Sequence, residues 1–255
     1  MSYPAPFVRD ATAEHRHTII LLHGRGSSGT ELAEELEETL GSGSANLFQR
    51  FPGVRWVFPS ARPRWSSVFE EEMSEWFDAP SLCDIGYKQH LQVEGLRQSV
   101  DFLLRVIEEE IDRVGSASKV VLGGISQGQA TALHALVCGR HRLGAFVGAS
   151  GWLPFADKIE EFLRGELGLE VEDLGDSFTS LLATPVFLGH GTDDNLIELD
   201  LGKQARDLLT RMGMSVSWKE YEGADQDGHW IKEPEEVDDI VAFLSDALED
   251  IVKQG

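Results

Sequence analysis

The sequence has little cysteine, and it has half as many basic residues as acidic ones. Its two cysteines, Cys83 and Cys138, do not have the spacing of a metal site, and two free thiols in a reducing compartment fit them better than a disulfide. The 22 Lys and Arg residues against 44 Asp and Glu residues give a formal net charge of −22. Because a surface of this sign repels phosphate backbones and anionic headgroups, nucleic acid is not an expected partner.

Long apolar runs are missing as well. No run approaches the roughly 20 apolar residues that a membrane-spanning helix needs. The first residues, Met1 to Pro6, lack the basic and apolar regions of a secretory signal, and Lys253-Gln254-Gly255 carries no lipidation or retention signal. These features predict a cytoplasmic protein without stable membrane insertion.

The length and the order of the segments predict one α/β domain over residues 1–255, large enough to bury a sizeable core. Short apolar runs without polar alternation indicate strands buried on both faces of a parallel sheet. The expected strands are Thr18–Leu22, Val54–Phe58, Lys119–Leu122, Ala145–Ala149, Pro185–Leu188 and Ser215–Tyr221. The expected helices are Ser28–Leu40, Leu91–Val114, Gln127–Arg140, Leu199–Met212 and Pro234–Val252. This alternation predicts a mostly parallel central sheet flanked by helices on both faces.

Two segments interrupt the alternation. Residues 59–84 contain proline, tryptophan and an acidic run at Glu70–Glu72. Residues 154–184 contain one helical pattern, Ala156–Leu167, and then an acidic stretch punctuated by glycine. Because connections this long in a compact domain usually form lids or binding sites, we expect both segments to be lid or binding-wall insertions.

The strongest motif is Gly124-Ile125-Ser126-Gln127-Gly128, which lies between an expected strand and an expected helix. This is the G-x-S-x-G nucleophile elbow in the strand–turn–helix context that it requires. Small residues two positions before and after the serine let its hydroxyl stand clear at the N-terminus of the helix, where the helix dipole favours a developing anion. The motif predicts Ser126 as a nucleophile.

A serine nucleophile needs a base, and this fold places the acid and then the histidine after the serine. His229 lies in a polar loop between the last strand and the last helix, where the base is needed, whereas His141 and His190 suit structural roles. The acid should follow the penultimate strand, and spacing alone leaves Asp193 and Asp194 open. The alternative for either aspartate is a turn residue that bonds to the backbone.

The oxyanion needs two backbone N–H donors that are fixed before the reaction begins. One donor is the residue after the nucleophile, Gln127, and the other should come from the loop after an early strand. The loop His23–Gly29 follows such a strand, is rich in glycine and would present the amide of Arg25. It has neither the dinucleotide-binding nor the Walker spacing, so phosphate binding is not expected.

With these parts in place, the chain resembles the phospholipase/carboxylesterase family of α/β-hydrolases, which includes the acyl-protein thioesterases. The resemblance covers about Thr18 to Leu248 and rests on five blocks in order. They are Leu21–Gly26, Met73–Asp78, Gly123–Gly128, Ser150–Pro154 and His190–Asp194. The resemblance selects Asp194 over Asp193 and supports Ser126, His229 and the amides of Arg25 and Gln127 in their roles. The chain departs from the family at Arg25, where an apolar residue is usual, and at Gln129, where a small one is.

Tryptophans near these blocks are candidates for substrate contact. Trp76, Trp152 with its neighbour Leu153, and Trp230 would form an apolar acyl-binding wall, because apolar and aromatic side chains predominate in ligand pockets. The alternative is that each tryptophan belongs to the core, with its indole N–H bonded locally.

The expected activity is hydrolysis of a carboxylic ester or thioester through an acyl-serine, as in an acyl-protein thioesterase or carboxylesterase. The substrate carries an acyl chain, with an S-acylated protein among the candidates, and no cofactor or metal is needed. The alternatives are a lysophospholipase, a short-chain small-molecule esterase or, in another class, an inactive α/β-hydrolase that serves as a binding module. The resemblance also allows a homodimer.

Overall fold

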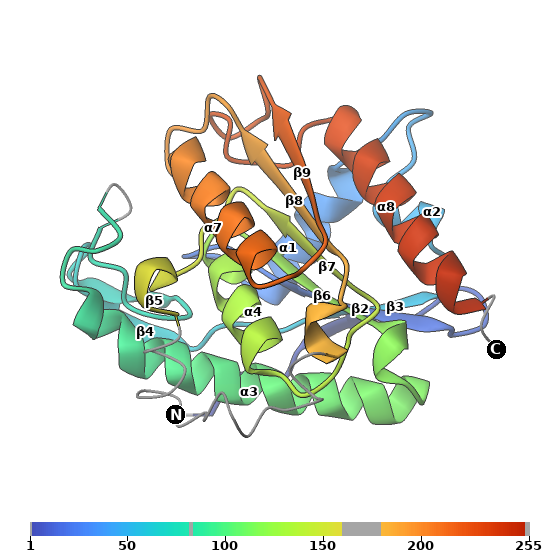
Figure 1. The fold of residues 1–255 in the computed structure, drawn as a ribbon, viewed down its shortest axis with the longest axis horizontal. Coiled ribbons are helices and arrows are strands. Elements are labelled where there is room, and N and C mark those ends of the chain that lie inside the picture. Colours follow the sequence, from blue (N-terminus) through green and yellow to red (C-terminus); the bar gives the residue numbers. More distant parts are fainter. Residues whose placement is uncertain (1, 82–83, 160–179, 253–255) are drawn as a thin grey trace.

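The computed structural model describes residues 2–81, 84–159 and 180–252, and a seven-stranded sheet lies at its centre (Figure 1). The strands are β1 (Phe7–Arg9), β2 (His17–Leu22), β3 (Val54–Phe58), β6 (Val120–Ile125), β7 (Ala145–Ala149), β8 (Val186–Gly191) and β9 (Val216–Tyr221). Their order in the sheet is β1-β3-β2-β6-β7-β8-β9, and every neighbouring pair is parallel except β1 with β3. The predicted mostly parallel sheet is confirmed.

Helices cover both faces of this sheet. Those of eight or more residues are α1 (Gly29–Glu38), α3 (Gln92–Val114), α4 (Gln127–Cys138), α7 (Leu199–Arg211) and α8 (Glu235–Val252). The shorter ones are α2 (Leu47–Arg50), η1 (Gln89–Leu91), η2 (Ala117–Lys119) and η3 (Ala156–Lys158). In Figure 1, α3, α4 and α7 lie on the near face of the sheet, and α1 lies behind it.

The core is divided by the sheet into two apolar clusters. One joins the near helices to strand residues such as Ile20, Leu122 and Leu188. The other joins α1, α2 and α8 to strand residues such as Ile19 and Phe187. Because alternate residues of the inner strands face opposite clusters, these strands have few polar positions, which explains the apolar runs in the sequence.

The structure adds elements that the sequence did not predict. Besides the edge strand β1 and the short helix α2, strands β4 (Pro63–Ser66) and β5 (Glu71–Ser74) form a separate antiparallel hairpin inside the first insertion. In the second insertion, residues 154–159, which include η3, and residues 180–184 can be compared with the prediction. The remainder of the expected helix Ala156–Leu167 lies outside the described residues.

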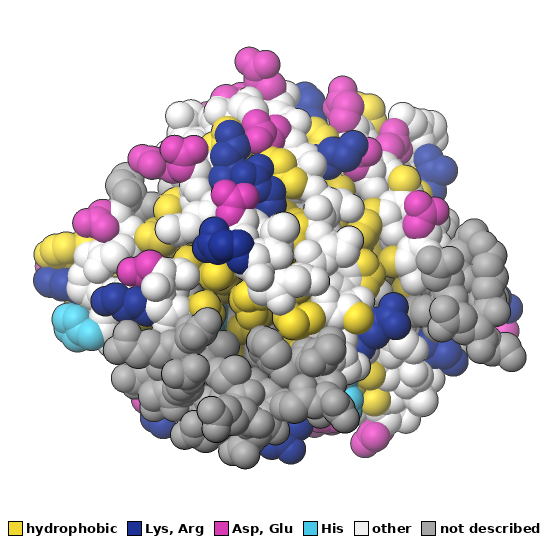
Figure 2. Space-filling view, in the orientation of Figure 1, with side chains coloured by type: hydrophobic (Ala, Val, Ile, Leu, Met, Phe, Trp, Pro, Cys, Tyr) yellow, Lys and Arg dark blue, Asp and Glu magenta, His cyan; other side chains and the backbone are white. Residues whose placement is uncertain are grey.

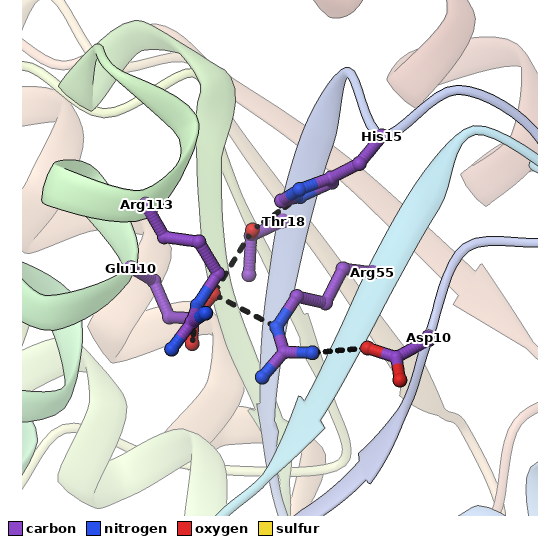
Figure 3. Close-up of polar contacts among 6 residues, drawn as sticks. All are labelled: Asp10, His15, Thr18, Arg55, Glu110 and Arg113. Carbon is purple, nitrogen blue, oxygen red and sulfur yellow. Dashed lines mark hydrogen bonds and ion pairs between the residues drawn. The ribbon is translucent and has the colours of Figure 1, made fainter.

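A buried polar network fastens α3 to the sheet at the edge where β2 and β3 begin (Figure 3). Glu110 Oε2 accepts hydrogen bonds from Thr18 Oγ1 and Arg55 Nε, both at 3.2 Å, and Glu110 Oε1 accepts one from Arg113 Nε at 3.2 Å. A further guanidinium nitrogen of Arg55 pairs with Asp10. Since buried polar groups need partners, this network satisfies Glu110 and fixes α3 against two strands.

No helix among the residues described here is long and apolar enough to cross a membrane.

Candidate active site

Ser126 sits on a strained turn between β6 and α4. Its backbone has φ 56° and ψ −124°, a conformation that residues with a side chain rarely adopt. A Cβ on Gly124 would lie 2.6 Å from the carbonyl carbon of Gly128, and one on Gly128 would lie 2.3 Å from the oxygen of Leu22. Only glycine fits at these two positions, as the motif predicts, because strand and helix approach too closely for a methyl group.

The acid loop and the histidine loop meet beside this turn. Asp194 Oδ2 lies 2.8 Å from His229 Nδ1, and the carboxylate has no exposed surface. Asp194 Oδ1 accepts hydrogen bonds from the amides of Leu196 and Ile197, both at 2.9 Å. Burial alone would raise the pKa of Asp194, but the hydrogen bond and charge of His229 and the two amides outweigh it and lower the pKa. An ionised Asp194 therefore holds the proton of the imidazole on Nδ1 and leaves Nε2 free as a base.

The neighbouring side chains are hydrogen-bonded elsewhere, although His190 Nε2 also lies 3.5 Å from Asp194 Oδ2. Asp193 Oδ2 accepts a hydrogen bond from the amide of Gly223 at 3.0 Å, which ties the acid loop to the histidine loop. His190 is buried in β8, and its Nε2 lies 2.9 Å from the carbonyl oxygen of Ile197. The structural role expected for His190 is confirmed, although β8 continues one residue past it. His141 contacts Glu108 at 2.9 Å, on the surface.

His23 anchors the loop that carries Arg25. Its Nδ1 lies 2.6 Å from the carbonyl oxygen of Gly24, and its Nε2 accepts a hydrogen bond from the amide of Ala61 at 2.9 Å. Burial lowers the pKa of His23 to about 4, so the ring is neutral and its proton is on Nδ1. The loop lies close to the nucleophile, since a Cβ on Gly24 would be 3.9 Å from Ser126 Oγ.

The side chain of Gln127 joins the first turn of α4 to the segment after β5. Its Oε1 accepts a hydrogen bond from the amide of Trp76 at 2.9 Å, and its Nε2 donates to the carbonyl oxygen of Phe77 at 2.8 Å. Trp76 in turn donates from Nε1 to the carbonyl oxygen of His23 at 2.9 Å. The two loops predicted to form the oxyanion site are therefore held together by buried hydrogen bonds. Sequence reasoning did not assign this role to Gln127 or His23.

A cavity of about 320 Å³ opens over the serine. Its lining includes Ser126, His229, Arg25 and Trp230, together with residues that flank them and residues of α1, the first insertion and the acid loop. These further residues are His23, Gly24, Ser27, Leu32, Glu35, Phe69, Met73, Ile125, Leu196 and Gln226. Phe69 and Met73 come from the first insertion, whose role as a lid or binding wall stays a prediction. The guanidinium of Arg25 lies 5.0 Å from the centre of the Phe69 ring and donates to the carbonyl oxygen of Ala79.

Of the four residues expected to contact the acyl chain, only Trp230 lines this cavity. Trp76, Trp152 and Leu153 are buried in the core, with exposed fractions of 0%, 1% and 1%. The indole N–H of Trp76 is bonded locally, as in the core alternative. A contact of these three residues with substrate therefore stays a prediction. Among the residues described, no group of three or more His, Cys, Asp or Glu could hold a metal ion.

Comparison with known proteins decides the family. A profile of the phospholipase/carboxylesterase family matches residues 4–248. The chain belongs to this family. It is 34% identical over 254 residues to acyl-protein thioesterase 1 of Yarrowia lipolytica, and the alignment covers 97% of this chain and 99% of that protein. It is 30% identical to acyl-protein thioesterase 1 of Gibberella zeae, with 96% of each chain covered.

The fold of this family member also agrees with a solved relative. The structure of Zea mays acyl-protein thioesterase 2 superposes with a TM-score of 0.73 at 26% identity, over 96% of this chain and all of the maize protein. These comparisons confirm the predicted α/β-hydrolase fold and the predicted class of enzyme, a hydrolase that acts on esters.

Proposed function

We propose that the protein hydrolyses carboxylic esters or thioesters through an acyl intermediate on Ser126. The observation that supports this most directly is the buried pair of Asp194 and His229, whose Oδ2 and Nδ1 atoms lie 2.8 Å apart. His229 lines the same cavity as Ser126, the serine on the strained turn. The roles are those of a nucleophile, a base and the acid that orients it.

In the first half of the reaction, Ser126 Oγ attacks the carbonyl carbon of the substrate while His229 Nε2 takes the hydroxyl proton. The N–H groups of Arg25 and Gln127 hold the oxyanion of the tetrahedral intermediate. The intermediate collapses when His229 gives its proton to the leaving alcohol or thiol. Water then attacks acyl-Ser126 by the same path and releases the carboxylic acid.

The leading substrate is an S-acylated protein in the cytoplasm, because the relatives over nearly the whole chain are named acyl-protein thioesterases. Apolar side chains such as Leu32, Met73 and Leu196 in the cavity suit an acyl chain. Lysophospholipids and small esters remain the alternatives within the enzyme class, and the homodimer stays a prediction.

The test compares three substrates for wild type and Ser126→Ala: an S-palmitoylated peptide, a lysophospholipid and p-nitrophenyl butyrate. We expect wild type to turn over the thioester with the highest kcat/KM, and we expect Ser126→Ala to lose at least about 10³-fold in kcat on every substrate. Turnover retained by Ser126→Ala would contradict the mechanism. Stoichiometric binding without turnover by wild type would instead support a binding module.

A further inference from the structure

The wall of the cavity over Ser126 carries one permanent positive charge. Arg25 is the one lysine or arginine among the described residues that line this cavity, and Glu35 is the one carboxylic acid among them. A guanidinium keeps its proton in proteins, so Arg25 is charged at any pH at which the protein folds. The cavity therefore has a fixed cation in its wall, although the net charge of the molecule is −22.

Two contacts fix the guanidinium of Arg25 and leave most of its donors unused. Its Nη1 donates to the carbonyl oxygen of Ala79 at 3.2 Å, and its carbon lies 5.0 Å from the centre of the Phe69 ring. A guanidinium has five N–H groups, and among the described residues this side chain makes one hydrogen bond. Because Arg25 and Phe69 both line the cavity, the stacked guanidinium belongs to its wall and offers donors there.

No carboxylate of the described residues forms an ion pair with Arg25. Partial burial lowers the pKa of Arg25, and the carboxyl groups of Glu75 and Asp78 act against this effect. Asp78 Oδ1 already accepts hydrogen bonds from the amide and the hydroxyl of Ser67, at 3.1 and 2.8 Å. Glu75 is fully buried, and burial raises its pKa to about 8, so it is largely uncharged at neutral pH. The charge of Arg25 is therefore left for another partner.

This charge lies close to the site of the proposed reaction. The backbone N–H of Arg25 is one of the two proposed oxyanion donors, and a Cβ on the preceding Gly24 would be 3.9 Å from Ser126 Oγ. The guanidinium is therefore within the length of one arginine side chain of the reacting carbonyl. A volume of about 320 Å³ is enough for a small ester with a polar group at one end.

We propose that Arg25 binds a carboxylate of the substrate, and that the protein prefers esters or thioesters with a carboxylate near the reacting carbonyl. The inference rests on the proposed function and names a chemical group of its substrate. A carboxylate matches the planar guanidinium through two parallel hydrogen bonds. It also matches the single charge of Arg25, whereas a phosphate dianion would keep a negative charge in a cavity that Glu35 lines.

The test measures kcat/KM for two sets of paired esters in 300 mM NaCl, which screens the long-range repulsion by the net charge. The first set compares p-nitrophenyl half-esters of glutaric, adipic and suberic acid with the pentanoate, hexanoate and octanoate, which have a methyl group in place of the carboxylate. The second set compares 4-carboxyphenyl butyrate with 4-carbamoylphenyl butyrate. The ratio of the two kcat/KM values within a pair does not depend on how much of a variant is folded.

Arg25→Leu removes the guanidinium and keeps the backbone N–H. We expect wild type to prefer the carboxylate in at least one pair, and Arg25→Leu to lower that ratio about 5- to 20-fold. Arg25→Lys should give an intermediate ratio, because an ammonium keeps the charge but lacks the planar fork. Arg25→Gln, which is neutral and polar, repeats the test in case leucine prevents folding.

The matched control is Glu35→Gln, which removes the carboxylate of the same lining. Because Glu35 is exposed, its loss should raise the ratio by less than about threefold. A ratio that falls in Arg25→Leu supports the inference, and the set in which it falls shows whether the acyl group or the leaving group carries the carboxylate.

The two proposals fail in different ways. Equal ratios in wild type, Arg25→Leu and Arg25→Gln for every pair, together with turnover that depends on Ser126, would overturn this inference and leave the proposed function standing. Wild type that hydrolyses no ester of either set would contradict both the inference and the proposed function.

Discussion

Asp193 and Asp194 are adjacent in the chain, and their side chains point to different partners. Asp194 contacts the imidazole of His229 and two amides of its own loop, whereas Asp193 accepts one hydrogen bond from Gly223. The contact of Asp194 fixes the tautomer of His229. The hydrogen bond of Asp193 fixes the separation between the acid loop and the histidine loop. The two aspartates therefore provide a matched pair for testing the mechanism.

Replacing Asp194 by asparagine should lower kcat by about 10⁴ without unfolding the protein, because an amide that donates to Nδ1 favours the wrong tautomer of His229. Steady-state hydrolysis of an activated ester measures the loss, and circular dichroism confirms the fold. Asp193→Asn should keep kcat within about tenfold of wild type, since its hydrogen bond is structural. Equal losses in the two variants would mean that the contact between Asp194 and His229 has no special part in turnover.

Glu236 is a buried carboxyl outside the reaction. Its exposed fraction is 2%, and its Oε2 accepts a hydrogen bond from the amide of Lys232 at 2.9 Å. Its Oε1 has no hydrogen-bond partner among the described residues. Burial raises the pKa of Glu236 to about 8. The folded state therefore keeps this proton at pH values where the unfolded chain, with an ordinary pKa near 4.5, has lost it.

The consequence is a stability that falls as the pH rises from about 4.5 to about 8 and then levels off. Glu236→Gln should remove this contribution. The difference between the free energy of unfolding of Glu236→Gln and that of wild type should therefore rise by more than about 1 kcal/mol from pH 5 to pH 9. Urea unfolding at several pH values measures it. The control is Glu235→Gln at an exposed neighbouring position. The same pH trend in both variants would contradict a role for the buried carboxyl.

At the scale of elements, the network around Glu110 joins α3 to β2 and β3 at the edge of the sheet where these strands begin. Ser126 follows the end of the parallel strand β6, so it lies at the opposite edge. Substitutions in this network should therefore change the stability of the fold without altering contacts in the candidate active site.

Glu110→Ala should lower the free energy of unfolding by about 3 kcal/mol, because it leaves the guanidinium of Arg55, whose side chain is 15% exposed, without its buried partner. Denaturant unfolding measures this loss, and kcat at a temperature below the transition should stay within about twofold of wild type. Glu109→Ala, at an exposed position of the same helix, should change the stability by less than about 0.5 kcal/mol. A large fall in kcat in folded Glu110→Ala would show that the two edges of the sheet are coupled.

Much of the sheet could be predicted because its strands are buried on both faces and read as apolar runs. Strand β3 and strand β7 have the predicted bounds. Strand β6 runs to Ile125 rather than Leu122. Close contact with β7 requires glycine at position 123, close contact with α4 requires glycine at position 124, and these glycines hid the end of the strand. Strands β4 and β5 escaped prediction because proline opens one and two glutamates open the other, and only their pairing makes them strands.

The positions of the candidate catalytic residues were more predictable than the walls of the cavity. Ser126 and His229 were predicted from the motif and the chain order. Choosing between Asp193 and Asp194 required either the family resemblance or the contacts in the structure. The lining by Leu32, Phe69 and Leu196 could not be predicted, because it depends on how α1, the hairpin and the acid loop meet in space. Burial of Trp76 depends likewise on Gln127, whose side chain holds the backbone of residues 76 and 77.

At the scale of the whole molecule, the net charge of −22 sets a field that acts on charged substrates before contact. Acidic side chains are scattered over the face drawn in Figure 2, with lysine and arginine side chains among them. On this face the acidic charge is therefore distributed rather than gathered in one patch.

This field predicts a salt dependence that differs between substrates. For an anionic ester such as p-nitrophenyl hemisuccinate, kcat/KM should rise about two- to fivefold between 10 mM and 300 mM NaCl, because salt screens the repulsion. For the neutral p-nitrophenyl butyrate it should stay nearly constant. Parallel responses of the two esters would show that the net charge does not influence encounter with substrate.

The most direct measurement of the central claim is labelling by a fluorophosphonate, which reacts only with an activated serine. Intact-mass analysis and peptide mapping of wild type, Ser126→Ala and Asp194→Asn would locate and quantify the adduct. We predict one adduct per chain on Ser126 in wild type, none in Ser126→Ala and much slower labelling in Asp194→Asn. An adduct on another residue, or a folded wild type that is not labelled, would contradict the proposal that Ser126 is the nucleophile of this hydrolase.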